Sequence, residues 1–176
     1  IVLACKNKSA VVTEESKPSS QQPPQLFDLT SLQREANARF GFSAKNTLGI
    51  AQALYERHKV LTYPRTDSRA LPEDYLQTVE ATIASLGEVS SSYQAFATQI
   101  KKNQWVKPNK RIFDNSKISD HFAIIPTVQE APKNLSEPEQ KLFDLVVRRF
   151  LAVFYPAAEY LITNRISTVS GHSFKT

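Results

Sequence analysis

The chain has 176 residues, of which 41% are hydrophobic, and its net charge is +5. This apolar content is enough to offset the conformational entropy of a folded chain, so the composition excludes disorder as the overall state. Cys5 is the only cysteine, so no internal disulfide forms, and the composition is typical of a reducing compartment. No apolar run approaches the roughly 18 residues that span a bilayer, and we expect no membrane partner. Because the sequence contains no methionine and begins at Ile1, we interpret it as a piece of a longer protein.

The first part of the chain combines strand and loop signals. Residues 1–5 and 10–13 are rich in β-prone side chains and are predicted to form two strands or a hairpin. Residues 14–24 are rich in serine, glutamine and proline, which indicates an extended linker or an exposed loop.

Helices follow. Thr30 and Gln33 have the spacing of a capping box, which predicts a helix that ends near Gly41, and Ser43 is expected to open a second helix. The pattern then predicts a short extended segment over residues 60–63, because Pro64 follows it.

The second half of the chain also contains helix signals, followed by strand signals at its end. Helices are predicted from Pro72 to Gly87 and over residues 93–102, followed by an irregular stretch over residues 103–133. Ser136 and Glu139 form another capping box and introduce a long amphipathic helix. Residues 159–174 are predicted to be a strand with a hairpin turn at Ser170-Gly171. Strands at both ends of a helical middle predict an α+β fold.

The positive charge is concentrated in residues 34–69 and 101–117, and an acidic stretch over residues 70–92 separates the two. Aromatic residues lie in or beside both basic regions. Such a mixture is typical of surfaces that hold a phosphate backbone and stack unpaired bases. The alternative is a set of solvated helix faces whose aromatic residues fill the core, and composition alone favours that alternative.

One polar segment carries candidate chemistry, namely Leu61-Thr-Tyr-Pro-Arg-Thr-Asp-Ser68. Residues two apart in an extended segment share a face, so Tyr63 and Arg65 are expected to address one group together. A nearby cation favours the phenolate, which is the better nucleophile, and a guanidinium stabilises charge that develops on a phosphate. The alternative is a half-buried strand tyrosine followed by a turn, and without further information that alternative is favoured.

A second polar segment runs from Ser116 to Pro126 and contains His121 between Asp120 and an apolar run. An imidazole at this position would donate to a phosphate oxygen or exchange a proton. A single histidine is more often a core or surface residue without a chemical role. The sequence contains no cluster of metal-ligating residues and no glycine-rich phosphate loop, so we expect neither a metal nor ATP to bind within this chain.

Taken together, five stretches resemble type IA DNA topoisomerases. The wording Tyr-Pro-Arg-Thr-Asp-Ser and the ending Ile-Ile-Pro-Thr are closer to the topoisomerase III branch than to topoisomerase I. The stretches are LFDLTSLQREA (26–36), RFGFS (39–43), AQALYE (51–56), LTYPRTDSR (61–69) and SDHFAIIPT (119–127). The resemblance covers residues 26–155 and reverses the preference for the structural alternatives.

The resemblance implies roles for particular residues. Tyr63 corresponds to the nucleophile that attacks single-stranded DNA and becomes linked to the 5′ phosphate, and Arg65 to the arginine that positions the tyrosine and the phosphate. His121 corresponds to a histidine that contacts bound DNA. With it we assign Lys117, Thr66 and Asp67 to DNA binding.

The resemblance also implies a fold and an activity. Residues 26–156 would form a mostly helical domain with the catalytic tyrosine, inserted into a β-rich arch domain to which residues 1–25 and 157–176 contribute strands. The full-length enzyme would pass one strand through another without ATP, in relaxation or decatenation, and would use Mg²⁺ bound by a domain outside this chain. We therefore expect this chain alone to be inactive.

The resemblance further implies single-stranded DNA as the partner, with a helicase or a single-strand-binding protein as candidates for a further one, and a cytoplasmic, nucleoid-associated location. A first alternative is a non-catalytic module that binds single-stranded nucleic acid, in which Tyr63 stacks on a base. A second alternative is a tyrosine recombinase, but the early Tyr-Pro-Arg arrangement fits that class poorly.

Overall fold

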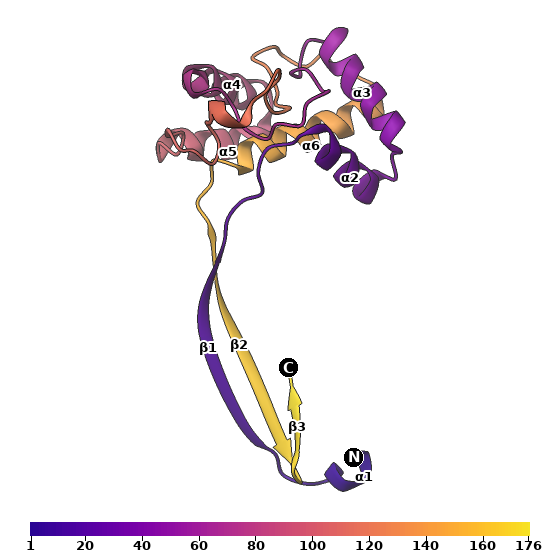
Figure 1. Cartoon of the computed structure of the whole chain (residues 1–176), viewed down its shortest axis with the longest axis vertical. Helices are drawn as coiled ribbons and strands as arrows, with labels where there is room; N and C mark the ends of the chain where they lie inside the picture. The colour runs from indigo at the N-terminus through magenta and orange to yellow at the C-terminus, as the bar shows by residue number, and fades with distance from the viewer. The chain divides into compact units, whose positions relative to one another are not determined.

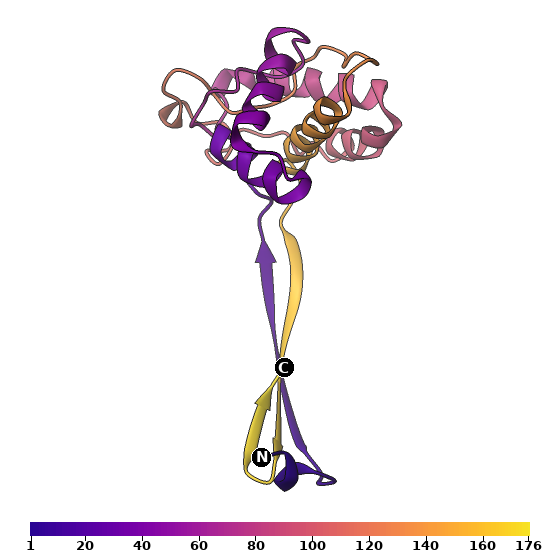
Figure 2. The same cartoon turned by 90° about the vertical axis from the view of Figure 1, so that its right-hand side faces the viewer.

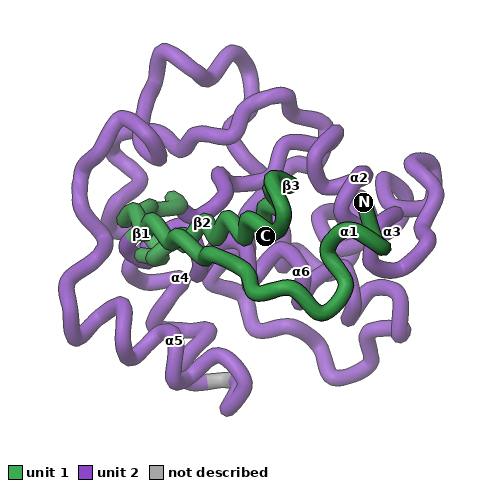
Figure 3. Tube along the Cα trace, turned by 90° about the horizontal axis from the view of Figure 1, so that it is seen from below, with its two compact units in different colours: residues 1–22, 157–176 green, residues 23–156 purple. Residues whose placement is uncertain are grey.

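The computed structural model describes residues 1–88 and 90–176 and divides the chain into two compact units. Residues 1–22 and 157–176 form the first unit, and residues 23–156 form the second (Figure 3). The strands belong to the first unit, and the longer helices belong to the second. The predicted α+β class is confirmed.

The first unit is a three-stranded antiparallel sheet in the order β1-β2-β3. Strand β1 (Val11–Gln21) pairs along its whole length with β2 (Ala158–Val169), and β3 (His172–Lys175) pairs with the end of β2 (Figure 2). Ser170 and Gly171 join β2 to β3 with φ values of 48° and 80°. Two consecutive residues with positive φ are typical of the tight turns that close hairpins. The predicted hairpin is therefore confirmed.

Two predictions for the start of the chain are wrong. Residues predicted as a first strand instead form the one-turn helix α1 (Val2–Cys5), which is closed by a bond of 3.0 Å from the Cys5 N–H to the Ile1 carbonyl. The predicted linker over residues 14–24 lies largely within β1. Pro18 lies in β1, which is an edge strand of this sheet, and edge strands are where proline is found within sheets.

The second unit packs its α-helices around α6 (Figure 1). The helices are α2 (Leu29–Phe40), α3 (Ala44–Glu56), α4 (Leu76–Val89), α5 (Ser91–Lys102) and α6 (Glu137–Ala152), with 3₁₀ turns η1 (Glu73–Tyr75) and η2 (Asn115–Lys117). Helix α6 contacts α2, α3 and α5 and buries the apolar face that the sequence predicts. In the part of the chain that is described, no helix has both the length and the apolar character that crossing a membrane requires.

Local signals account for most helix ends. Ser43 caps α3, and Gly41 ends α2 with a φ of 70°, both as predicted. The start of α2 differs from the prediction, because Asp28 rather than Thr30 is the N-cap. The Asp28 carboxylate accepts a bond of 2.6 Å from the Ser31 N–H, and Ser31 accepts from the Asp28 N–H in return. A carboxylate satisfies the free N–H groups of a first turn well, and Asp28 therefore takes the position two residues earlier.

The capping box at the start of α6 forms as predicted and extends into a cluster. The Glu139 carboxylate accepts bonds from the Ser136 N–H at 2.8 Å and from the Ser136 hydroxyl at 2.7 Å. Its other oxygen is bonded to Arg57 and lies 3.1 Å from His58 Nε2. Bonding to Ser136, with further bonds from Arg57 and His58, lowers the pKa of Glu139 to about 2 although burial opposes this. Glu139 therefore ties α6 to the end of α3.

We predict that Glu139→Gln destabilises the chain at neutral pH by about 1–2 kcal/mol, because it weakens a helix cap and removes the charge that Arg57 faces. The pKa of Glu139 in the folded chain lies below the usual 4.5, so its stabilising effect is present above pH 4.5 and is lost as the pH falls toward 2. Urea unfolding followed by circular dichroism between pH 7 and pH 2 measures both effects.

Glu137→Gln is the matched control, because Glu137 lies in the same first turn but is exposed, and its ion pair is with Lys141 one turn along the same helix. We expect it to change the stability by less than about 0.5 kcal/mol. Equal stability of Glu139→Gln and the parent chain at every pH would contradict the role assigned to the cluster.

Candidate active site

Two irregular segments of the second unit, residues 60–71 and 113–127, lie side by side and carry the candidate site. The Thr62 N–H donates to the Ile125 carbonyl at 3.0 Å, and the Ala123 N–H donates to the Ala70 carbonyl at 3.0 Å. Leu61 forms an isolated antiparallel bridge with Pro126. These bonds bring together two polar segments that are far apart in the sequence.

Three hydroxyl side chains strengthen this pairing, because each donates to a backbone carbonyl of the other segment. The donors are Thr62, Thr66 and Ser68, and the acceptors are the carbonyl oxygens of Ala123, His121 and Lys117, at 3.0, 2.9 and 2.8 Å respectively. Each hydroxyl also accepts a backbone N–H. A hydroxyl has one proton to donate, so all three donors are fully used within the fold.

Tyr63 and His121 are in contact as a result. Their ring centroids are 4.2 Å apart, with an angle of 41° between the ring planes. Tyr55, from the last turn of α3, packs its ring against Tyr63 at 5.4 Å and 80°, which is an edge-to-face arrangement. Tyr63 is thus held on two sides while it remains partly exposed.

Arg65 has an exposed side chain that lies against Gln52 of α3. With the Gln52 amide oxygen turned toward the guanidinium, it accepts from Arg65 Nε at 3.3 Å and from Nη2 at 3.2 Å. Among the described residues, no hydrogen bond joins Arg65 to Tyr63. The guanidinium therefore has free donors, and α3 supports both members of the predicted pair.

The other predicted DNA-binding residues have different surroundings. Asp67 is exposed, whereas Thr66 is buried and its hydroxyl proton is used on the His121 carbonyl. Lys117 pairs with Asp114 at 2.8 Å. Bonds from Lys117 and then from Ser116 lower the pKa of Asp114 to about 2. Much of the Lys117 charge is therefore neutralised within the fold.

Sequence reasoning assigned no role at the site to Gln52, Tyr55 and Lys59. Gln52 and Tyr55 are three residues apart and share one face of α3, and this spacing just before the tyrosine segment is the signal that identifies them. Lys59 follows α3 with a φ of 59°, and its ammonium lies 5.7 Å from the centre of the Tyr55 ring. Nothing in the sequence indicates that backbone conformation for a lysine.

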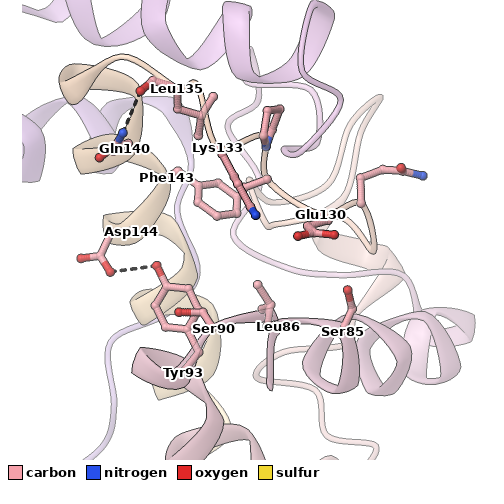
Figure 4. A pocket seen from close by; sticks show the side chains of 13 residues that line it. Ser85, Leu86, Ser90, Tyr93, Glu130, Lys133, Leu135, Gln140, Phe143 and Asp144 are labelled. Carbon is pink, nitrogen blue, oxygen red and sulfur yellow. Dashed lines mark hydrogen bonds between the residues drawn. The ribbon is translucent and has the colours of Figure 1, made fainter. Parts of the chain in front are cut away.

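A pocket of about 330 Å³ opens beside Tyr63. Its lining consists of Tyr55, Lys59, Leu61, Thr62, Tyr63, His121, Phe122 and Thr127. Another pocket, of about 360 Å³, lies between the ends of α4, α5 and α6 (Figure 4). There the Tyr93 hydroxyl donates to Asp144 at 2.9 Å, and burial together with Asp144 raises the pKa of Tyr93. None of the predicted site residues lines the pocket between α4, α5 and α6. The pocket beside Tyr63 is therefore the candidate site.

The fit of a metal ion can be judged from the side chains that are present. Within residues 1–88 and 90–176, no three or more histidine, cysteine, aspartate or glutamate side chains gather as they would around a metal ion. The described residues therefore provide no set of ligands that would fit Mg²⁺.

Comparison with known proteins gives consistent matches. A family model described as DNA topoisomerase matches residues 1–176. The chain is 47% identical over 169 residues to DNA topoisomerase 3 of Bacillus subtilis (strain 168), which covers 95% of this chain and 23% of the relative. It is 49% identical over 158 residues to DNA topoisomerase 3 of Bacillus cereus, covering 88% of this chain and 21% of the relative. The chain thus spans less than a quarter of the length of these relatives.

A solved structure, full-length topoisomerase I from Thermotoga maritima, is similar as well. The TM-score is 0.68 and the sequence identity 25%, and the match covers 98% of this chain and 28% of that chain. The fold is therefore shared over nearly the whole chain.

We predict that Thr66→Val loosens the contact between Tyr63 and His121. The change leaves the His121 carbonyl without its donor and the Ser68 N–H without its acceptor, which costs about 1–3 kcal/mol. Urea unfolding measures the loss of stability. Proton NMR of the His121 imidazole measures the contact, because the Tyr63 ring current shifts its resonances. Thr66→Ser keeps the hydroxyl and is expected to preserve both.

Thr82→Val is the control, because Thr82 is also buried but donates to the Thr78 carbonyl within its own helix α4. That carbonyl lies in the hydrogen-bonded helix, so we expect a smaller loss of stability and unchanged His121 resonances. Unchanged His121 resonances in Thr66→Val would contradict the positioning effect of this hydroxyl.

Proposed function

Because the chain belongs to the type IA DNA topoisomerase family, we propose that it carries the tyrosine with which the full-length protein cleaves and reseals single-stranded DNA. The observation that carries the proposal is the placement of Tyr63, whose partly exposed ring contacts His121 and lines an open pocket. Arg65 lies two residues away with an exposed guanidinium. A nucleophile, a phosphate-binding cation and an imidazole are thus available on one short stretch of surface.

The proposed reaction is a transesterification. The Tyr63 hydroxyl oxygen attacks the phosphorus of a phosphodiester, a bond forms between them, and the bond from phosphorus to the 3′ oxygen breaks. The phenolic proton ends on the 3′ oxygen, so the products are a 5′-phosphotyrosine and a free 3′ hydroxyl. The reverse attack by that hydroxyl reseals the strand. No bond energy is lost to hydrolysis, so resealing needs no ATP.

Neighbouring side chains have defined tasks in this proposal. The Arg65 guanidinium donates to the phosphate oxygens, where negative charge increases as the phosphorus becomes five-coordinate. His121 would contact the same phosphate or its neighbour, and the packing of its ring on Tyr63 supports this assignment. Asp67 and the Lys117 ammonium lie at the exposed margin of this surface. Thr66 acts on DNA only through its hydrogen bond to His121.

Strand passage requires more than this chain. We propose that residues 26–156 form a helical domain inserted into a β-rich arch domain, and that residues 1–25 and 157–176 contribute strands to that arch. Another strand passes through the break before resealing, which produces relaxation or decatenation. The full-length protein would use Mg²⁺ held by residues outside this chain, since the described residues do not form a metal site.

Single-stranded DNA is the proposed substrate, since a free phosphodiester and unpaired bases suit a cationic surface with exposed aromatic rings. A helicase or a single-strand-binding protein would supply such strands from a duplex, and the full-length protein would act at the nucleoid. A non-catalytic binding module would use the same aromatic surface without forming a covalent bond, and the presence of a covalent adduct distinguishes the two.

We predict that Tyr63→Phe in the full-length protein abolishes covalent adduct formation, because the substitution removes the attacking oxygen and keeps the ring that packs on His121. Binding to single-stranded DNA is expected to change by less than about twofold, since the loss of an uncharged hydroxyl at a partly exposed site costs well under 1 kcal/mol. The adduct is measured by denaturing electrophoresis of an end-labelled oligonucleotide after rapid denaturation, and binding by fluorescence anisotropy.

Tyr160→Phe is the matched control, because Tyr160 is an exposed tyrosine on β2 and is 52% exposed. It is expected to form the adduct like the parent protein. An adduct that survives in Tyr63→Phe would show that another residue attacks. Binding without any adduct in the parent protein would support the non-catalytic module.

We predict that the 176-residue chain alone does not relax negatively supercoiled plasmid DNA in the presence of Mg²⁺, because a metal site and the path for a second strand are needed as well. Agarose gel electrophoresis of plasmid topoisomers provides the measurement, with the full-length protein as the positive control. Efficient relaxation by the chain alone would contradict the proposal that other domains are required.

A further inference from the structure

The pocket beside Tyr63 has aromatic side chains on several sides. Its rings come from α3 and from both irregular segments, and they belong to Tyr55, Tyr63, His121 and Phe122. Lys59 supplies the one ammonium group in the described lining. The volume of about 330 Å³ is within the range of pockets that bind small organic groups. The pocket therefore suits a flat, unsaturated group with hydrogen-bond acceptors at its edge.

We propose that this pocket receives the unpaired nucleobase of the nucleotide whose 5′ phosphate is transferred to Tyr63. The inference rests on the proposed function, because Tyr63 both lines the pocket and would attack the phosphate. A group in the pocket therefore lies close to that phosphate. In the covalent product, the nucleotide on the 3′ side of the cleaved bond stays joined to Tyr63 through this phosphate, which leaves its base and its sugar as the candidates. Aromatic walls favour the base, since every base has a π-face and stacking on an aromatic side chain is tolerant of sequence.

Tyr55 is the stacking surface in this arrangement. Its ring stands at 80° to that of Tyr63, with the centroids 5.4 Å apart, so the two rings form adjacent walls rather than a parallel stack. The exposed side chain of Lys59 lies over the Tyr55 ring, at 5.7 Å from its centre. A base that enters takes over this ring face, and the flexible ammonium moves to the carbonyl and ring-nitrogen acceptors at the edge of the base.

The backbone at Lys59 supports a role for its side chain outside folding. The φ of Lys59 is 59°, and the Val60 N–H bonds back to the Leu54 carbonyl at 3.0 Å, which closes the end of α3. Glycine is the favoured residue at such a position, because a side chain makes the left-handed conformation unfavourable. The fold would thus accept glycine here, and the lysine places a positive charge at the pocket instead.

A base can enter this pocket only when it has left its pairing partner and its stack. The pocket therefore gives a physical reason for a single-stranded substrate at the cleavage position itself. It also predicts that the requirement is local, for one nucleotide on the 3′ side of the cleaved bond.

The experiment uses the full-length protein and an oligonucleotide whose cleavage position has first been mapped. An abasic site is placed at the nucleotide on the 3′ side of the cleaved bond or, as a comparison, at the sixth nucleotide beyond it. We expect the adjoining abasic site to lower the rate of adduct formation by about tenfold or more, which is the loss expected for one stacked base, and the distant site to have less than a twofold effect.

Two variants connect the effect to the pocket. Tyr55→Leu is expected to slow cleavage of the intact oligonucleotide about tenfold and to have no further effect on the adjoining abasic oligonucleotide, because both changes remove the same contact. Lys59→Gly is expected to bind the intact oligonucleotide more weakly than the parent protein does. The thermal unfolding temperature of this variant is expected to stay equal or to rise, since glycine suits the positive φ. Tyr160→Leu, on exposed β2, serves as the control and is expected to cleave both oligonucleotides like the parent.

Equal cleavage of the intact and the adjoining abasic oligonucleotide would overturn the proposal, as would independent, multiplicative effects of Tyr55→Leu and the abasic site. These outcomes are distinct from a failure of the proposed function. An adduct that depends on Tyr63 but is insensitive to the adjoining base removes only the pocket assignment, whereas an adduct that persists in Tyr63→Phe removes the premise on which the assignment rests.

Discussion

The candidate site depends on the hydroxyl-to-carbonyl bonds that hold residues 60–71 against residues 113–127. Neither segment is a regular strand, so much of its backbone lacks the partners that a sheet ladder supplies, and buried polar groups without partners are costly. Thr62, Thr66 and Ser68 supply donors for three of these carbonyls and accept N–H groups in return. The tyrosine and the histidine meet because this pairing fixes the register of one segment against the other.

Helix α3 is the rigid element behind this pairing. One face of its last turns presents Gln52 to Arg65 and Tyr55 to Tyr63, and the residues after it continue directly into the tyrosine segment. Glu139 of α6 bonds to Arg57 and lies next to His58 at the end of α3. Helix α6, at the centre of the core, therefore also holds the residues that lead from α3 into the tyrosine segment. Functional loops are commonly positioned by a rigid scaffold in this way.

Sequence patterns predicted those features whose causes are local. The caps at Ser43 and Ser136 and the turn at Ser170 follow from side chains within a few residues, and all three form as expected. The long strand β1 could not be predicted from its serine and proline content, because its stability comes from pairing with β2 at the other end of the chain. In the site, the motif resemblance singled out Tyr63 and, separately, His121. The contact between their rings was not predicted, because it depends on the buried hydroxyl of Thr66, whose partner no sequence pattern indicates.

Ion pairs within the fold neutralise part of the positive charge of the two basic regions. In the first region Arg57 pairs with Glu139 and Arg69 with Asp28, and in the second Lys110 pairs with Glu73 and Lys117 with Asp114. Counting basic residues along the sequence therefore overstates the charge that faces a ligand. Over the described part of the chain, Lys59 and Arg65 form no ion pair; Lys59 lines the Tyr63 pocket, and Arg65 lies two residues from Tyr63. Because an unpaired cation beside a partly apolar pocket attracts phosphate more effectively than a neutralised one, these two residues contribute positive charge where the proposed nucleophile lies.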